Sequence, residues 1–273
     1  MALDLHSFGT FAPTSGQSGA IEFARRFDPG PFSKLAASLA KRLIWPSLNG
    51  PLDVTTWGIF MRLDPRRNIT EKRLLLSPSR FELEERNILA ARLKMGDKFV
   101  DVGANIGAYT LWVAKIIGPQ GTGIAIEPQP KVLARLRANV ALNPNFHVHI
   151  FPCGAGPYEA TMQLSVGSTN EGGASLATDQ GGGATVEVPI RPLLDMVLEA
   201  GFDRIDALKI DIEGFEDQAL VPFFDQAPKR LWPRLLILER SEKDWRDDLL
   251  AKLKSAGYRD LATTKRNYVM ELV

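Results

Sequence analysis

Residues 98–107, which read KFVDVGANIG, are the stretch that decides the fold. The apolar run KFVDV predicts a buried strand over 98–102, and the pattern over 109–117 predicts a helix soon after it. Between them, Gly103 and Gly107 allow a tight turn and a close backbone approach to a ligand. In a doubly wound sheet such a turn lies at the carboxyl end of a strand, where ligands bind. The stretch therefore predicts an α/β fold with a binding site at the end of this strand.

Strand and helix patterns alternate through the rest of the chain, after a helix expected over 81–93. Further strands are expected at 123–127, 147–151, 206–212, 235–239, 258–263 and 267–272, with extended segments around a glycine-rich loop over 158–191. Further helices are expected at 130–142, 192–200, 215–224 and 244–255. Strands that alternate with helices imply right-handed crossovers and a mainly parallel sheet. We therefore expect residues 81–273 to form a Rossmann-like, doubly wound domain with helices on both faces of the sheet.

Residues 1–80 differ in character and are expected to form an N-terminal extension with both helical and strand segments. Its first 31 residues are rich in Gly, Pro, Ser and Thr and predict a loop or a loosely ordered tail, while 51–80 predict short strands and turns. An amphipathic helix is expected over 32–45. Its apolar face would consist of Phe32, Leu35, Leu39, Leu43 and Ile44. Peripheral contact with a membrane or a partner is one interpretation of this helix, and packing of its apolar face on the same domain is the favoured one.

Charge and composition exclude several classes of protein. Lys and Arg total 33 against 32 Asp and Glu, and a net charge of +1 disfavours bulk nucleic-acid binding. No run approaches the ~18–20 apolar residues that a transmembrane segment needs. A single cysteine, Cys153, excludes an intramolecular disulfide and a cysteine-based zinc site. The first residues lack a basic end followed by an apolar core, so we expect a cytoplasmic enzyme. The sequence indicates no oligomeric state.

The residues around the glycine turn predict a nucleoside site. Glu127 ends the next expected strand, 26 residues after Asp101 (127 − 101), where an acid can accept hydrogen bonds from ribose hydroxyls. The dinucleotide pattern G-x-G-x-x-G is absent, because Gly107 follows Gly103 after three residues and Asn105 replaces the second glycine. This spacing argues against the alternative of a nicotinamide-dependent oxidoreductase. Asp101 suits a cationic ligand better than a phosphate, and S-adenosylmethionine carries a sulfonium and an α-ammonium group.

A second group of polar residues lies near the end of the strand expected over 206–212. Lys209, Asp211 and Glu213 alternate, so their side chains share one face while the strand continues. They could orient a hydroxyl acceptor or act as general base, an effect worth ~10²–10⁴ in rate. The structural alternative is a Lys–carboxylate ion pair with a helix cap, and a closed pair would favour a non-catalytic, partner-binding protein. Asp211, Glu213 and Glu239 could instead converge on a divalent metal such as Mg²⁺.

Five segments in order, FVDVGANIGAYT, AIEPQP, NEGGASL, LKIDIEGFE and LLILE, resemble the FkbM-type S-adenosylmethionine-dependent methyltransferases. The resemblance runs from about Phe81 to Val273. It implies a Rossmann-like methyltransferase sheet with S-adenosylmethionine as cofactor. It also implies methyl transfer to oxygen, commonly a sugar hydroxyl of a glycan, a glycolipid or a secondary metabolite, and leaves the acceptor and the position of methylation open.

The resemblance also implies a role for individual residues. The methionine end of the cofactor would be held by Asp101, Gly103, Asn105 and Gly107, and the ribose by Glu127. The adenine would lie near Pro152, Cys153, Gly154 and Ala155, and the methyl donor beside Asp211 and Glu213. Where the family often has an acid and then a histidine after the LLILE strand, this chain has Glu239, Arg240 and Ser241, which leaves a histidine base in doubt.

Three weaker patterns carry alternatives of their own. His147 and His149 alternate on a strand and could bind a metal, but solvated side chains on an edge strand are favoured. A basic cluster could bind an anionic acceptor, such as a phosphorylated or nucleotide-linked sugar, or form a solvated turn. This basic cluster consists of Arg66, Arg67, Lys72 and Arg73. The segment 170–175, NEGGAS, could form a lid over the site or an ordinary surface loop.

Overall fold

The computed structural model describes residues 6–166 and 184–273. Its centre is a seven-stranded sheet in the order β11-β12-β10-β9-β3-β4-β5. The strands are β3 (Lys98–Val102), β4 (Thr122–Ile126), β5 (Val148–Phe151), β9 (Ala207–Ile210), β10 (Leu235–Glu239), β11 (Tyr258–Thr263) and β12 (Asn267–Leu272). The first five of these run parallel, and β12 and β11 are antiparallel at one edge. The expected doubly wound, mainly parallel sheet is confirmed.

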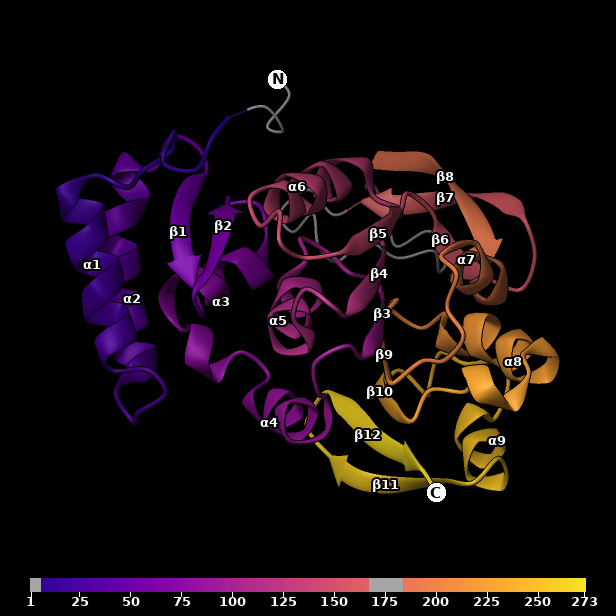
Figure 1. Cartoon of the computed structure of the whole chain (residues 1–273). Coiled ribbons are helices and arrows are strands. Elements are labelled where there is room, and N and C mark those ends of the chain that lie inside the picture. Colours follow the sequence, from indigo (N-terminus) through magenta and orange to yellow (C-terminus); the bar gives the residue numbers. More distant parts are fainter. Residues whose placement is uncertain (1–5, 167–183) are drawn as a thin grey trace.

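Helices cover both faces of this sheet (Figure 1). One face carries α4 (Leu83–Arg92), α5 (Ala108–Ile117) and α6 (Pro130–Ala141), and the other carries α7 (Leu193–Glu199), α8 (Glu216–Gln226) and α9 (Leu249–Ser255). The last helix is shorter than predicted, because residues 244–248 form turns. A three-stranded sheet, ordered β6-β8-β7, follows β5. It consists of β6 (Gly154–Gly156), β7 (Ala160–Val166) and β8 (Ala184–Pro192).

Side chains of the central strands alternate between two apolar clusters. Val100 and Val102 of β3 pack in the cluster that includes α7, α8 and α9, while Phe99 packs in the cluster that includes α5. Asp101 therefore shares the face of Phe99, and its register partner Lys209 lies beside it on β9. This alternation places the polar residues at the strand ends on the α5 side of the sheet.

The N-terminal extension covers that same side. It contains α1 (Ser15–Arg26), α2 (Ser33–Ile44), the hairpin of β1 (Leu52–Thr56) and β2 (Ile59–Leu63), and α3 (Ile69–Leu76). Short 3₁₀ helices lie at Trp45–Ser47, Pro78–Arg80 and Lys229–Leu231. The extension shares one apolar cluster with β3 and α5, so its packing shapes the site beside the sheet. The domain boundary at residue 80 stays a prediction.

One prediction for the extension is wrong, and a second is confirmed by the hairpin of β1 and β2 but not by the residues after it. The expected tail contains α1, because Thr14 forms a capping box: its Oγ1 accepts from Gln17 N at 3.3 Å, and Gln17 Oε1 accepts from Thr14 N at 2.9 Å. The expected strands and turns over 51–80 include α3, whose first turn is capped by Asn68 through a 2.8 Å bond from Thr70 N. In both places a side-chain cap at the first turn stabilises a helix, although the glycine content or the turn residues predict no helix.

The face by which α2 packs also differs from the prediction. The predicted apolar stripe is exposed except for Ile44, with exposed fractions from 40% to 68%. This exposed stripe consists of Phe32, Leu35, Leu39 and Leu43. The helix packs against α1 and α3 and buries Ala36, Ala40 and Ile44, because small side chains four residues apart allow a neighbouring helix to approach closely. Contact of the exposed stripe with a membrane or a partner stays a prediction. Among the described residues, no helix has both the length and the apolar character for a membrane crossing.

Candidate active site

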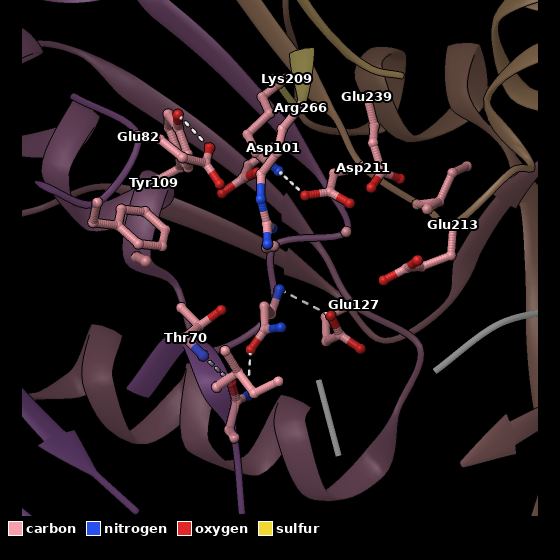
Figure 2. A pocket seen from close by; sticks show the side chains of 18 of the residues that line it. Thr70, Glu82, Asp101, Tyr109, Glu127, Lys209, Asp211, Glu213, Glu239 and Arg266 are labelled. Carbon is pink, nitrogen blue, oxygen red and sulfur yellow. Dashed lines mark hydrogen bonds and ion pairs between the residues drawn. The ribbon is translucent and has the colours of Figure 1, made fainter. Parts of the chain in front are cut away.

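A cavity of about 430 Å³ lies at the carboxyl ends of the central parallel strands (Figure 2). Residues that end or follow β3, β4, β9 and β10 line it. The N-terminal extension closes one side with Asn68, Ile69, Thr70 and Arg73, and Phe81 and Glu82 before α4 also line the cavity. Such a volume is within the ~300–1,000 Å³ typical of small-molecule sites. The lining is rich in charged groups, so the chemistry of the cavity depends on the hydrogen bonds, the burial and the protonation state of each group.

The glycine turn brings the chain close to the end of β9. Gly103 has φ +77°, and a Cβ at this position would overlap the carbonyl oxygen of Asp211. Gly107 has φ +87°, and a Cβ there would lie 2.8 Å from Leu136 Cδ1. Asn105, also left-handed at φ +52°, donates its backbone N–H to Glu127 Oε2 at 2.9 Å. The turn therefore requires glycine at two positions and is tied to the neighbouring strand by Glu127.

Glu127 is buried, with an exposed fraction of 7%, and lines the cavity after β4. Its carboxylate accepts two backbone N–H groups, from Asn105 at 2.9 Å and from Gln129 at 2.9 Å. Burial raises the pKa of Glu127 to about 7, and these two bonds oppose the rise. Each carboxylate oxygen has a second lone pair, so the group can accept further hydrogen bonds from a ligand in the cavity.

Asp101 has a buried acceptor that the described residues leave without a partner. Its exposed fraction is 1%, and its Oδ2 accepts from Thr110 Oγ1 at 2.6 Å, while Oδ1 has no hydrogen-bond partner in 6–166 or 184–273. Burial raises the pKa of Asp101, and the nearby ammonium group of Lys209 opposes the rise. An unsatisfied buried acceptor costs ~1–3 kcal/mol, so a ligand with a cationic donor would fit beside Oδ1.

Lys209 and Asp211 form an ion pair at the end of β9, with Nζ and Oδ2 3.1 Å apart. Burial opposes the charge of Lys209, but the carboxylates of Asp211, Asp101 and Glu82 outweigh burial and raise its pKa. Burial likewise opposes ionisation of Asp211, and Lys209 outweighs it, so the pKa of Asp211 is lowered. Glu239, hydrogen-bonded to Asp211, has its pKa raised by burial and then by the Asp211 charge. At neutral pH the cluster therefore holds an ionised Asp211 beside a protonated Glu239.

The ion pair leaves the acidic residues accessible from the cavity. The side chain of Asp211 is 32% exposed, and Asp211 and Glu213 both line the cavity. Glu213 is exposed, has φ +56°, and has its pKa raised by burial and then by Asp211. The helix cap expected beside this pair does not form, because α8 begins after Phe215, which makes no side-chain hydrogen bond to the first turn. Glu216 Oε1 instead accepts from Ile212 N at 2.9 Å and from Gly214 N at 3.3 Å, in the loop before the helix. The ion pair forms and does not close the site.

The structure does not support the alternative in which Asp211, Glu213 and Glu239 converge on a divalent metal. Within 6–166 and 184–273, no three His, Cys, Asp or Glu side chains meet in a group able to hold a metal ion.

The remaining predicted residues lie in different surroundings. Cys153 is buried in the apolar cluster on the opposite face of the sheet, where its Sγ contacts Met196 Sδ at 3.3 Å. Cys153 does not line the cavity, whereas the next two residues, Gly154 and Ala155, do. Burial raises the pKa of the Cys153 thiol to about 11. His147 and His149 are exposed at the edge strand β5, as the favoured interpretation predicted. The segment 170–175 lies outside the described residues.

Several lining residues carried no signal in the sequence. Glu82, left-handed at φ +41°, precedes α4, and its Oε2 accepts from Tyr109 Oη at 2.7 Å. The Tyr109 ring lies 5.2 Å from Lys209 Nζ, so it covers the ion pair. Of the basic cluster predicted at 66–73, Arg73 reaches the cavity, where Lys265 and Arg266 from the β11–β12 turn join it. These residues come together at the cavity only because segments far apart in the sequence pack against one another.

Comparisons with known proteins give the following matches. The family described as the methyltransferase FkbM domain matches residues 101–259. Methyltransferase sdnD of Sordaria araneosa is 29% identical over 160 residues, which are 48% of this chain and 61% of that protein. The 31-O-demethyl-FK506 methyltransferase FkbM of Streptomyces tacrolimicus is 31% identical over 175 residues, 52% of this chain and 64% of that protein. The chain thus spans less than two thirds of the length of these relatives.

Among solved structures, a SAM-dependent methyltransferase from Aquifex aeolicus aligns with a TM-score of 0.41 and 17% identity. The alignment covers 72% of this chain and 94% of that one.

Proposed function

The chain belongs to the FkbM methyltransferase family, and from that premise we propose that it is an S-adenosylmethionine-dependent O-methyltransferase. The acceptor would be a hydroxyl group of a sugar, a glycan or a glycosylated metabolite. The cytoplasmic location expected from the sequence is part of this proposal. The observation that carries it is the pair of buried carboxylates at adjacent strand ends: Asp101 with an unsatisfied oxygen, and Glu127 bound to the glycine turn.

The cavity residues fit the cofactor group by group. The unsatisfied Oδ1 of Asp101 would accept from the α-ammonium group, and the free lone pairs of Glu127 would accept from the two ribose hydroxyls. Gly154 and Ala155 would lie beside the adenine. When bound, S-adenosylmethionine supplies an electrophilic methyl group on a sulfonium centre. The mixture of two acids and small residues suits a cationic nucleoside better than a dinucleotide phosphate.

The second cluster would prepare the acceptor. Lys209 keeps Asp211 ionised, so its carboxylate can accept a hydrogen bond from the acceptor hydroxyl and fix the direction of the oxygen. As the new C–O bond forms, the bond between the methyl carbon and the donor sulfur would break and leave S-adenosylhomocysteine, while the hydroxyl proton passes to this carboxylate. The protonated Glu239 beside Asp211 cannot compete for that proton. In this arrangement Asp211 is the catalytic residue, and Lys209 and Glu239 position it.

Asp211→Asn tests the assignment. The variant retains the shape of the residue but removes the charge, so methyl transfer should fall ~10²-fold or more while S-adenosylhomocysteine affinity changes little. Transfer of a labelled methyl group to a panel of sugars and glycosides, with calorimetric titration of S-adenosylhomocysteine, separates the two effects. Asp225→Asn, at an exposed ion pair on α8, is the matched control and should leave both unchanged. Equal losses of transfer and binding for Asp211→Asn would show that the residue holds the cofactor instead.

A further inference from the structure

A second cavity, of about 550 Å³, adjoins the proposed cofactor cavity. Its walls come from α2, from residues 77–85 and from the β11–β12 turn over 264–266. The two cavities share five lining residues, so they meet at a common junction. The shared residues are Arg73, Phe81, Glu82, Lys265 and Arg266. A substrate could therefore extend from the reacting centre into the second cavity.

The second cavity is lined by five cationic side chains. They are Lys34, Arg73, Arg80, Lys265 and Arg266. The structure shows no ion pair and no side-chain hydrogen bond from any of these five to another described residue. Two of the three acids in the wall have partners of their own: Glu82 accepts from Tyr109 Oη at 2.7 Å, and Glu85 accepts from Thr264 Oγ1 at 2.6 Å. The five cations can therefore still donate hydrogen bonds to a ligand, although the charge of Glu82 acts on Arg73 and the charge of Asp211 acts on Arg266.

Arg73 and Arg266 are the two cations at the junction that come from distant parts of the chain. Arg73 is half-buried on α3, and Arg266 projects from the β11–β12 turn into the first cavity (Figure 2). Burial lowers the pKa of Arg73, the charge of Arg266 lowers it further, and the carboxylate of Glu82 opposes both effects. Two guanidinium groups that repel each other beside a cavity are stabilised when an anion binds between them.

We propose that the acceptor carries a phosphate or carboxylate group, which Arg73 and Arg266 bind at the junction of the two cavities. The inference rests on the proposed function and names the class of its substrate. Guanidinium groups match both oxyanions because each presents paired N–H donors in a plane. Lys34 and Arg80 line the second cavity alone and extend the positive lining away from the strand ends, which favours an anion on the acceptor side of the junction.

The residues proposed to hold the methyl donor lie in the first cavity, apart from Arg73 and Arg266. Asp101, Gly103, Glu127 and Gly154 line the first cavity alone, whereas the guanidinium pair lines both. An anionic group at the pair would leave the neutral hydroxyls of the acceptor free to reach Asp211. The carboxylate of the donor's methionine part is the competing ligand for the pair, and the experiment must distinguish the two.

The test is titration of the protein, saturated with S-adenosylhomocysteine, with glucose 6-phosphate, glucuronate, inorganic phosphate and glucose. We expect the anions to bind and glucose to bind far more weakly. Arg73→Gln and Arg266→Gln should each weaken anion binding by ~10-fold or more, with S-adenosylhomocysteine affinity unchanged. Tighter binding of glucose 6-phosphate would assign a phosphate, and tighter binding of glucuronate a carboxylate.

The matched control is Arg67→Gln, from the same basic stretch, whose side chain pairs with Asp64 at 3.2 Å outside both cavities. It should change neither anion nor S-adenosylhomocysteine binding. Anion binding that is absent, or that survives both variants, overturns the inference while the proposed function stands. Loss of S-adenosylhomocysteine affinity in the variants also overturns it, because the pair would then hold the donor. Wild-type protein that binds no S-adenosylhomocysteine contradicts the proposed function itself.

Discussion

Replacement of Glu127 by Gln tests the electrostatics of the site most fully. Burial raises the pKa of this carboxyl from 4.5 to about 7, which corresponds to ~3 kcal/mol. The folded protein binds this proton more tightly than the unfolded chain does. The stabilising contribution of Glu127 is therefore fully present below pH 4.5, decreases as the pH rises, and is lost above about pH 7.

Glu127→Gln removes that dependence on pH, because the amide does not titrate. The new amide accepts only one of the two backbone N–H groups, which lowers stability by ~1–3 kcal/mol at every pH. The free energy of unfolding of the variant, relative to that of the wild type, should therefore rise by ~3 kcal/mol between pH 4.5 and pH 8. The variant is expected to be less stable than the wild type in acid and about as stable, or more so, at pH 8.

Urea unfolding across this pH range measures the difference in free energy of unfolding between the variant and the wild type. Glu22→Gln, at an exposed position of α1, is the matched control. The control should show no such pH-dependent difference. Titration of S-adenosylhomocysteine at pH 8 supplies the second readout. The affinity should fall ~10-fold or more in Glu127→Gln, since charge-assisted bonds to the ribose are lost. A stability difference that stays constant with pH would refute the proposed electrostatics of Glu127.

Four further variants test the backbone conformation and the packing of the chain. Gly103→Ala should lower the free energy of unfolding by ~2 kcal/mol or more in urea melts, because φ is +77° and the new Cβ overlaps a carbonyl oxygen; wild-type stability would contradict this. Leu43→Ser, on the exposed face of α2, should change the free energy of unfolding by less than ~0.5 kcal/mol. Ala40→Asp, on the buried face of the same helix, should lower it by ~3 kcal/mol or more. A larger loss for Leu43→Ser than for Ala40→Asp would refute the packing of α2. Asp53→Ala leaves Arg62 buried without its 2.7 Å partner and should cost ~3–5 kcal/mol, measured in the same way.

The central strands could be predicted because each is an apolar run bounded by turn residues. β3 and β10 have the predicted bounds, and the polar residues after them meet at one edge because parallel strands end together. Asp101, Glu127 and Asp211 therefore line one cavity, although they are far apart in the sequence.

Other features depend on contacts that periodicity does not reveal. The helix α1 requires a reciprocal cap between Thr14 and Gln17 within a glycine- and serine-rich stretch. The sequence does not reveal which face of α2 is buried, because a periodic stripe of Leu indicates an apolar surface but not which face another helix covers. Glu82 and Arg266 reach the cavity through the packing of the extension and of an antiparallel hairpin, and neither carries a local motif.

The most direct test of the central claim is calorimetric titration of the purified protein with S-adenosylhomocysteine, with NAD titrated in parallel. The arrangement of Asp101 and Glu127 around the glycine turn predicts that S-adenosylhomocysteine binds at one site per chain and that NAD does not bind. Binding of NAD alone, or of neither compound by folded protein, would contradict the assignment of a methyl-donor site.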